Sequence, residues 1–189
     1  MRSVNVMLNN TEKQQLKELA RRSIRHGLAT GEPLRVKLDE FGENLQVVGA
    51  SFVSLHLRGR LRGCMGSLEA HRALADDVAR NAYAAAFLDT RFMPLQEEEL
   101  QELDIHISIL SPRSPMCVRS ENDLLEQLQP GVDGLLIELG ERRATFLPAV
   151  WKELPNPRDF VNQLKRKAGL DPNKWEPGIQ VSRYTTTEF

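Results

Sequence analysis

Residues 61–68 of the chain read Leu61-Arg62-Gly63-Cys64-Met65-Gly66-Ser67-Leu68. The apolar segment Leu45–Leu57 precedes this stretch, and both have the composition of β-strands. Gly59 and Arg60 between them are expected to form the tight turn of a β-hairpin. Two glycines within one strand indicate a bulge, or a close approach by backbone or ligand. We therefore expect this hairpin to organise the fold and to form the floor of the functional site.

The segments outside the hairpin predict helices packed against further strands. Thr11 and Gln14 form a capping-box pattern that starts a helix, and Gly27 is expected to end it. Further helices are expected from about Leu74 to near Asp89, from Ser120 through Leu128, and from the cap Asn156 to Gly169. Further strands are expected at Leu34–Leu38, Leu103–Ile109, Leu135–Leu139, Ala144–Leu147 and Val181–Tyr184. Strands and helices do not alternate regularly, which predicts an α+β fold with a largely antiparallel sheet and packed helices.

Composition and charge favour a single soluble domain spanning residues 1–189. Hydrophobic residues make up 41% and charged residues 27% of the chain, which is typical of globular proteins. Lysine and arginine number 25 against 26 aspartate and glutamate, so no overall positive field attracts nucleic acid. We see no apolar run long enough for a membrane span, and only two cysteines. These features predict a cytoplasmic protein without membrane attachment, and the oligomeric state is left open.

The role of Cys64 depends on the register of the hairpin. A two-residue turn at Gly59 and Arg60 predicts that Leu55 faces Cys64 and that His56 faces Gly63. Cys64 would then share a face with leucines, and His56 would point to the opposite face. On this register His56 is a poor base for the thiol. Both a packing role and a catalytic role for Cys64 stay open.

The residues around Cys64 also suggest a binding site for anions. Backbone amides at Gly63 and Gly66, together with the guanidinium of Arg62, are suited to a carboxylate or phosphate. Arg143 and Lys167 belong to two basic clusters, Arg142-Arg143 and Lys165-Arg166-Lys167, that we expect to lie near each other. The alternative for Arg62 is a bulged strand end with a surface arginine, and for the basic clusters a solvated helix face.

Asp89 and Arg91 follow the predicted second helix. A structural ion pair at the helix end is the simpler expectation, and orientation of a substrate is the alternative.

The four histidines have no spacing that binds a metal from one helix or hairpin, so no metal ligands are assigned and the cofactor stays unknown. Trp151 and Trp175 are expected to be core or staple residues and not base-stacking platforms, because no aromatic residue lies between closely spaced basic residues.

Several motifs in order along the chain resemble the AMMECR-one domain family, and in particular its bacterial AmmeMemoRadiSam system protein A members. They are Leu61–Leu68, Asp89–Phe92, Gly134-Leu135, Arg143–Pro148, Arg166–Leu170 and Trp175. Together they cover nearly the whole chain.

The resemblance implies an α+β fold with a larger and a smaller lobe, and with the glycine-cysteine motif near a cleft between them. It also implies partners, because family members are encoded beside or fused to a Memo-type protein and a radical S-adenosylmethionine (SAM) enzyme. We expect an enzyme or accessory factor of a modification pathway, with Cys64 and Arg62 as catalytic residues. Gly63, Gly66, Asp89, Arg91, Arg143 and Lys167 are the expected binding residues. The alternatives are a non-catalytic module that binds an anionic small molecule or partner peptide and, third, a nucleic-acid-associated protein.

Overall fold

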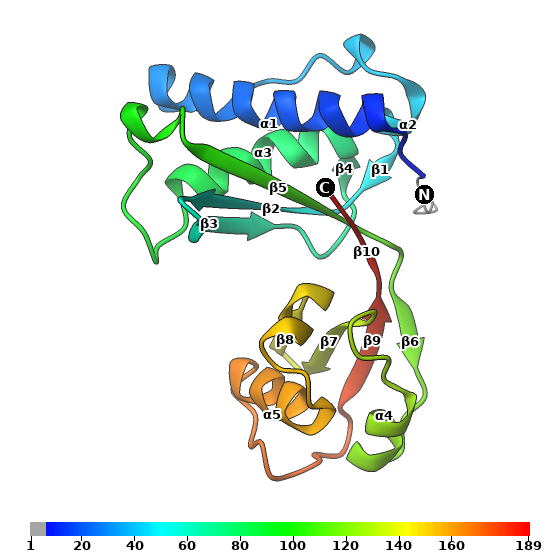
Figure 1. Ribbon diagram of the computed structural model, residues 1–189. Helices are drawn as coiled ribbons and strands as arrows, with labels where there is room; N and C mark the ends of the chain where they lie inside the picture. Colours follow the sequence, from blue (N-terminus) through cyan, green and yellow to red (C-terminus); the bar gives the residue numbers. More distant parts are fainter. Residues whose placement is uncertain (1–6) are drawn as a thin grey trace. The chain divides into compact units, whose positions relative to one another are not determined.

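The computed structural model describes residues 7–189, which divide into two compact units (Figure 1). The first unit comprises the described chain up to Ser111 together with Thr187–Phe189, and the second comprises Pro112–Thr186. Each unit contains a four-stranded sheet and its own helices. The pairings whose register is defined are antiparallel, so the expected α+β class is confirmed.

The first unit is a sheet with helices on one face. Its strands lie in the order β10 (Thr186–Glu188), β5 (Leu103–Leu110), β2 (Ser51–Leu57) and β3 (Arg60–Gly66). Helices α1 (Asn10–Thr30) and α3 (Leu74–Phe87) pack against each other and against this sheet (Figure 1). The smaller elements of the unit are η1 (Leu38–Glu40), α2 (Glu43–Gln46), β1 (Val48–Gly49), β4 (Arg72–Ala73) and η2 (Glu97–Glu99). The expected strand at Leu34–Leu38 is therefore wrong, and Leu45–Leu57 divides among α2, β1 and β2.

Helix α1 begins and ends outside its expected caps. Asn9 is the N-cap and exchanges side-chain and backbone hydrogen bonds with Glu12, so Thr11 lies inside the helix. Gly31, with a φ of 74°, ends the helix in place of Gly27. Gly27 is buried, and a Cβ atom there would lie within 3 Å of the Tyr83 and Phe87 rings of α3. It therefore serves the close packing of two helices.

The turn between β2 and β3 lies one residue earlier than expected. Arg58 and Gly59 form it, with φ values of 52° and 76°. Two positive φ values are the mark of the hairpin turn whose twist matches that of its strands. A non-glycine residue in this region is uncommon, which explains why the sequence pattern placed the turn at the next residue pair.

The observed register moves Cys64 to the other face of the sheet. Cys64 pairs with Ser54 and Gly63 pairs with Leu55, while a bulge follows at His56, which pairs with Leu61. Directly opposed residues point to the same face, so Cys64 lies with Ser54 and away from the helix-covered face that carries Leu55. The expectation that Cys64 faces leucines and is separated from the face of His56 is therefore wrong.

The second unit packs helices against a sheet of order β6-β9-β7-β8. Its elements are β6 (Ser114–Met116), α4 (Glu121–Gln127), β7 (Gly134–Leu139), β8 (Arg142–Phe146), η3 (Pro148–Lys152), α5 (Pro157–Lys167) and β9 (Gln180–Tyr184). Trp151 is buried, stacks on Phe160 with ring centroids 3.8 Å apart, and donates a hydrogen bond to the carbonyl of Asp133. Trp175 is half-buried against the same core. The core position expected for Trp151 is confirmed, and Trp175 packs against that core without being fully buried.

A buried ion pair joins α5 to α4. Lys165 is fully buried, and its ammonium donates to Glu121 at 2.6 Å and to the carbonyl of Pro172 at 2.8 Å. The expectation of a solvated basic helix face therefore fails at Lys165. A buried ammonium is tolerated only when paired, so Glu121 is the residue on which its burial depends.

We predict that Glu121→Ala destabilises the second unit more than Lys165→Met does. The first change strands a buried charge, which costs about 3–5 kcal/mol, whereas the second leaves a carboxylate that Arg158 also contacts at 3.4 Å. Guanidinium unfolding followed by tryptophan fluorescence measures both, because both tryptophans lie in this unit. The control is Lys174→Met, which removes an exposed pair with Asp171 and should change stability by less than about 1 kcal/mol. Equal losses for Glu121→Ala and Lys174→Met would contradict the assignment.

Candidate functional site

The backbone of Cys64 is held by an ion pair at the edge of the first unit's sheet. β3 is an edge strand, so the Cys64 peptide groups that point outward have no neighbouring strand to bond. Asp89 accepts the Cys64 N–H at 2.9 Å, and Arg91 donates to the Cys64 carbonyl at 3.5 Å. Arg91 also donates twice to the Asp89 carboxylate, at 2.9 and 2.7 Å. The pair thus substitutes for a strand at this one residue.

The electrostatics of Asp89 follow from this arrangement. Its side chain is 5% exposed, while that of Arg91 is 57% exposed. Hydrogen bonds from Arg91, and then from the amides of Cys64 and Arg91, hold the pKa of the Asp89 carboxyl well below its usual range despite burial. Asp89 is therefore ionised wherever the protein is folded near neutral pH. The expected ion pair between Asp89 and Arg91 is present, and it acts on the cysteine itself.

Close packing explains both glycines of the motif. A Cβ atom on Gly63 would lie 2.1 Å from the carbonyl oxygen of Ala85, near the end of α3. A Cβ atom on Gly66 would lie 2.2 Å from the ring of Phe52, which occupies the space above it. Gly63 thus lets β3 approach the helix backbone, and the short connection from the end of α3 to Asp89 places the carboxylate beside Cys64.

Arg62 is engaged by a partner that the sequence analysis missed. Its guanidinium donates to Glu99 at 2.7 and 2.9 Å, and the two side chains are only 14% and 22% exposed. The pKa of Glu99 is lowered chiefly by this contact. The Phe92 ring lies near two guanidinium groups, with ring-centroid distances of 6.0 Å to Arg62 and 5.4 Å to Arg91. Carboxylates of the protein already bond Arg62 Nε and Nη2 and the Cys64 amide, whereas the buried Nη1 of Arg62 has no hydrogen-bond partner in the described part of the chain. The role of this motif in anion binding stays a prediction.

The thiol of Cys64 has polar neighbours on the sheet face away from α1 and α3. Ser54 donates a hydrogen bond from Oγ to the half-buried Cys64 Sγ at 3.3 Å. His106 of β5 is the register partner of Ser54 on the other side, so Cys64, Ser54 and His106 form a row across three adjacent strands. Asp104 lies 2.7 Å from His106 Nε2, and the His56 ring meets the His106 ring edge-on at 4.9 Å.

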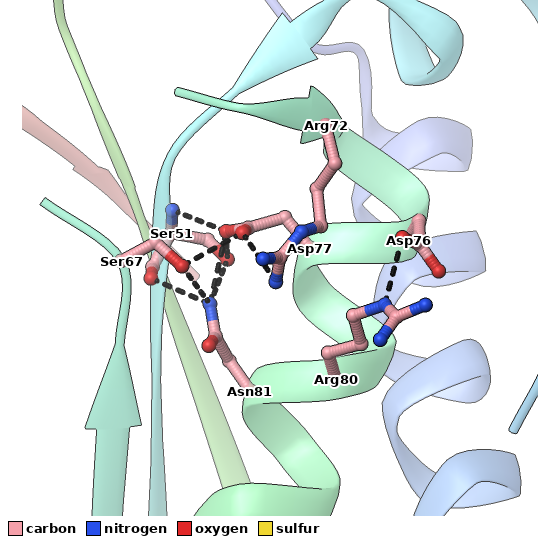
Figure 2. A network of polar contacts seen from close by, with 7 residues as sticks. All are labelled: Ser51, Ser67, Arg72, Asp76, Asp77, Arg80 and Asn81. Atoms are coloured by element: carbon pink, nitrogen blue, oxygen red, sulfur yellow. Dashed lines mark hydrogen bonds and ion pairs between the residues drawn. The ribbon is translucent and has the colours of Figure 1, made fainter. Parts of the chain in front are cut away.

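A buried network fixes the end of the motif at Ser67. Asp77 of α3 accepts hydrogen bonds from the Ser51 amide and hydroxyl at 2.8 and 2.7 Å, and from the Ser67 hydroxyl at 2.8 Å (Figure 2). Asn81 adds a bond to Asp77 at 2.9 Å, and Arg72 lies 3.6 Å away. Burial raises the pKa of Asp77, although the serine and arginine contacts oppose that shift. The network anchors both strands of the hairpin to α3.

Arg143 and Lys167 lie in the second unit, on β8 and α5. Lys167 donates to the carbonyl of Thr145 at 3.0 Å and lies 5.1 Å from the Phe146 ring centroid. The two basic segments are neighbours, as expected, because α5 packs against β8. Their proposed role in binding stays a prediction. Arg62, Gly63, Cys64, Gly66, Asp89 and Arg91, by contrast, are gathered around β3 in the first unit.

Other residues of the site were missed although the sequence carries a signal for them. Asp77 and Asn81 are polar residues at helical i,i+4 spacing beside the apolar stripe of α3, and such positions indicate a buried network. Ser54, Asp104 and His106 were missed because their grouping depends on the register of the strands.

Within residues 7–189, no cluster of histidine, cysteine and acidic side chains has the arrangement of a metal site. In the same range, no helix has the length and apolarity to cross a membrane.

We predict that Asp89→Asn removes a pH-dependent part of the stability. The folded pKa of Asp89 is lowered, so its contribution is present above the unfolded value of about 4 and is lost as pH falls toward the folded value. At pH 7 the variant should be less stable by roughly 2 kcal/mol, the scale of hydrogen bonds to a charged group. Urea unfolding between pH 2 and pH 7 should show this gap closing in acid. The control, Asp76→Asn, breaks an exposed pair with Arg80 and should leave a small, flat difference; a flat difference for Asp89→Asn would contradict the assignment.

Comparison with known proteins identifies the family. A protein of Methanothermobacter thermautotrophicus is 34% identical over 184 residues, covering 96% of this chain and 95% of its own. A protein of Saccharolobus islandicus is 33% identical over 191 residues, covering 94% of this chain and 80% of its own. The crystal structure of an uncharacterized Pyrococcus horikoshii protein superposes with a TM-score of 0.88 at 28% identity, covering 96% of this chain and 92% of that one. The AMMECR1 family profile matches residues 17–189, and the chain therefore belongs to the AMMECR1 family.

Proposed function

We propose that this AMMECR1 protein is a cytoplasmic enzyme or accessory factor of a modification pathway in which the Cys64 thiol accepts a chemical group. Its proposed partners are a Memo-type protein and a radical SAM enzyme. One observation carries the proposal: Cys64 has its backbone fixed by Asp89 and Arg91 and its sulfur bonded by Ser54. A structural cysteine in a core needs neither contact.

The surroundings of Cys64 favour a reactive thiol. The thiolate is the nucleophilic form of cysteine, and a nearby guanidinium stabilises it. Arg91 donates to the Cys64 carbonyl at 3.5 Å, which places its guanidinium beside this cysteine. The fixed backbone and the hydrogen bond from Ser54 restrict the positions of the sulfur, which lowers the entropic cost of reaching a transition state.

The alternative of an anion-binding module has less support from the geometry. Arg62 and the Cys64 amide are the donors that such a pocket needs, and they already bond Glu99 and Asp89. A ligand at the Cys64 amide would have to displace Asp89, and at Arg62 the buried Nη1 is a donor that Glu99 leaves without a partner among the residues that the structure describes. The thiol requires no such displacement.

Alkylation with iodoacetamide, followed by peptide mass spectrometry, tests the proposal. Cys117 is the other cysteine of the chain and is exposed, so it provides an internal reference in the same sample. We expect half-buried Cys64 to react in the folded protein at least as fast as it does in urea. Prior incubation with the Memo-type protein, the radical SAM enzyme and S-adenosylmethionine under reducing conditions should block Cys64 and leave Cys117 reactive.

Two results would count against the proposal. If Cys64 reacts only when the protein unfolds, a thiol-based function is excluded. If Cys64 reacts but the partner proteins leave its labelling unchanged, the thiol function stands and the proposed pathway is wrong.

A further inference from the structure

The sheet face around Cys64 carries the groups needed to remove the proton from its thiol. We infer that Ser54, His106 and Asp104 form a proton relay for Cys64, an assignment that rests on the proposed thiol function. Ser54 is the intermediate carrier, His106 is the base, and Asp104 orients the imidazole. The site would suit a substrate that offers an electrophilic carbon with a leaving group, such as an activated acyl or alkyl donor.

The register brings these groups together in one row. Ser54 is paired with Cys64 on one side and with His106 on the other, so its Cα lies between those of the cysteine and the histidine. Directly opposed side chains on neighbouring strands have Cβ atoms about 4.5–5.5 Å apart. The Ser54 hydroxyl already bonds the sulfur at 3.3 Å. No residue of this row comes from a loop, so sheet hydrogen bonding sets the spacing.

Asp104 gives His106 the tautomer that a base requires. The contact of 2.7 Å joins Asp104 Oδ2 to His106 Nε2, which places the proton of a neutral imidazole on Nε2. The other nitrogen, Nδ1, is then left to accept a proton. The pKa of Asp104 is lowered chiefly by this hydrogen bond, so the carboxylate stays ionised and stabilises an imidazolium.

The charged and titratable groups around His106 are compatible with this role. His56 of β2 is the nearest second imidazole, and burial lowers its pKa, with His106 acting in the same direction and Asp104 opposing. His56 is therefore neutral at pH 7 and does not repel a charged His106. The positive charge of Lys17 on α1 also lowers the pKa of Asp104 and so favours its ionised form.

The transfer balances without a further reactant. The thiol proton passes to Ser54 Oγ as the Ser54 hydroxyl proton passes to His106 Nδ1, so an S–H bond breaks and an N–H bond forms. Ser54 is unchanged overall, and its O–H then donates to the thiolate, the direction in which the contact stands in the structure. The thiolate forms a bond to the electrophilic carbon, and the leaving group departs with its electron pair.

The pH profile of iodoacetamide alkylation tests the relay in a Cys117→Ser background, where Cys64 is the remaining thiol. In this reaction an S–C bond forms and iodide leaves. We expect His106→Gln and Ser54→Ala to slow alkylation at pH 7 by about tenfold or more, a conservative value for general-base catalysis. Asp104→Asn should slow it as well, and Ser54→Thr, which keeps a hydroxyl, should restore most of the rate. The differences should shrink at high pH, where hydroxide removes the thiol proton.

The matched control is His71→Gln. His71 and Glu69 form an imidazole–carboxylate pair at 3.2 Å with the same two-residue spacing, away from the row. This variant should alkylate like the background protein. Thermal unfolding of each variant separates a lost relay from a lost fold, because an unfolded variant would lose its cooperative transition.

The outcomes distinguish this inference from the proposed function. If Cys64 alkylates readily in the folded background protein and His106→Gln or Ser54→Ala does not slow it, the relay is wrong and the thiol function stands. A loss confined to His56→Gln would also overturn the relay, because it would assign the base to the other imidazole. If Cys64 in the folded background protein does not react at all, both the function and the relay fail.

Discussion

The hydrogen bond from the Cys64 amide to Asp89 is the interaction on which the site depends. It forms at the edge of a sheet, where an outward-pointing amide otherwise meets solvent or another chain. Its geometry requires β3 to lie against the end of α3, and that approach requires glycine at position 63. The carboxylate is then locked by Arg91, which also reaches the Cys64 carbonyl. One ion pair therefore satisfies both outward-pointing groups of the cysteine.

The position of Cys64 in β3 also determines which face of the sheet its side chain occupies. With the backbone of Cys64 fixed, its side chain must point toward Ser54 and away from the helices. The helix-covered face carries the apolar core of the first unit, including Val53, Leu55 and Ile107. The opposite face at the same strand positions carries serine, cysteine and histidine. The hairpin is thus divided into a helix-covered apolar face and an opposite face on which Cys64 lies beside Ser54.

Much of the architecture follows from local sequence patterns. Asn156 and Pro157 begin α5 as expected, Ser120 caps α4, and the alternation in Leu103–Ile109 gives β5. These features depend on neighbouring residues alone, so local sequence patterns are enough to predict them. The turn of the hairpin does not, because Arg58 adopts a positive φ that its residue type disfavours.

The bulge between Leu55 and His56 changed the interpretation of the site. Moving the two-residue turn by one position changes the pairing by two residues, which alone would leave Cys64 on the face of Leu55. The extra residue of the bulge moves Cys64 to the face of Ser54, so the predicted separation of the thiol from the histidine face was wrong. Local sequence patterns could not predict the Arg62–Glu99 and Lys165–Glu121 pairs either, because the two residues of each pair are 37 and 44 positions apart in the chain. Gly63, Cys64, Asp89 and Arg91 were assigned to one site with the help of the motif resemblance, and the structure brings them together, while their roles stay predictions. Their mutual geometry required the fold.

Hydrogen exchange of the Cys64 amide, followed by nuclear magnetic resonance, tests the central claim most directly. An outward-facing amide of an edge strand exchanges nearly as fast as one in an unfolded chain. The bond to the buried carboxylate of Asp89 predicts exchange slower by about ten- to a hundredfold, the factor that corresponds to a hydrogen bond with a charged acceptor. Exchange of the Cys64 amide at the rate of an unstructured peptide would contradict the account.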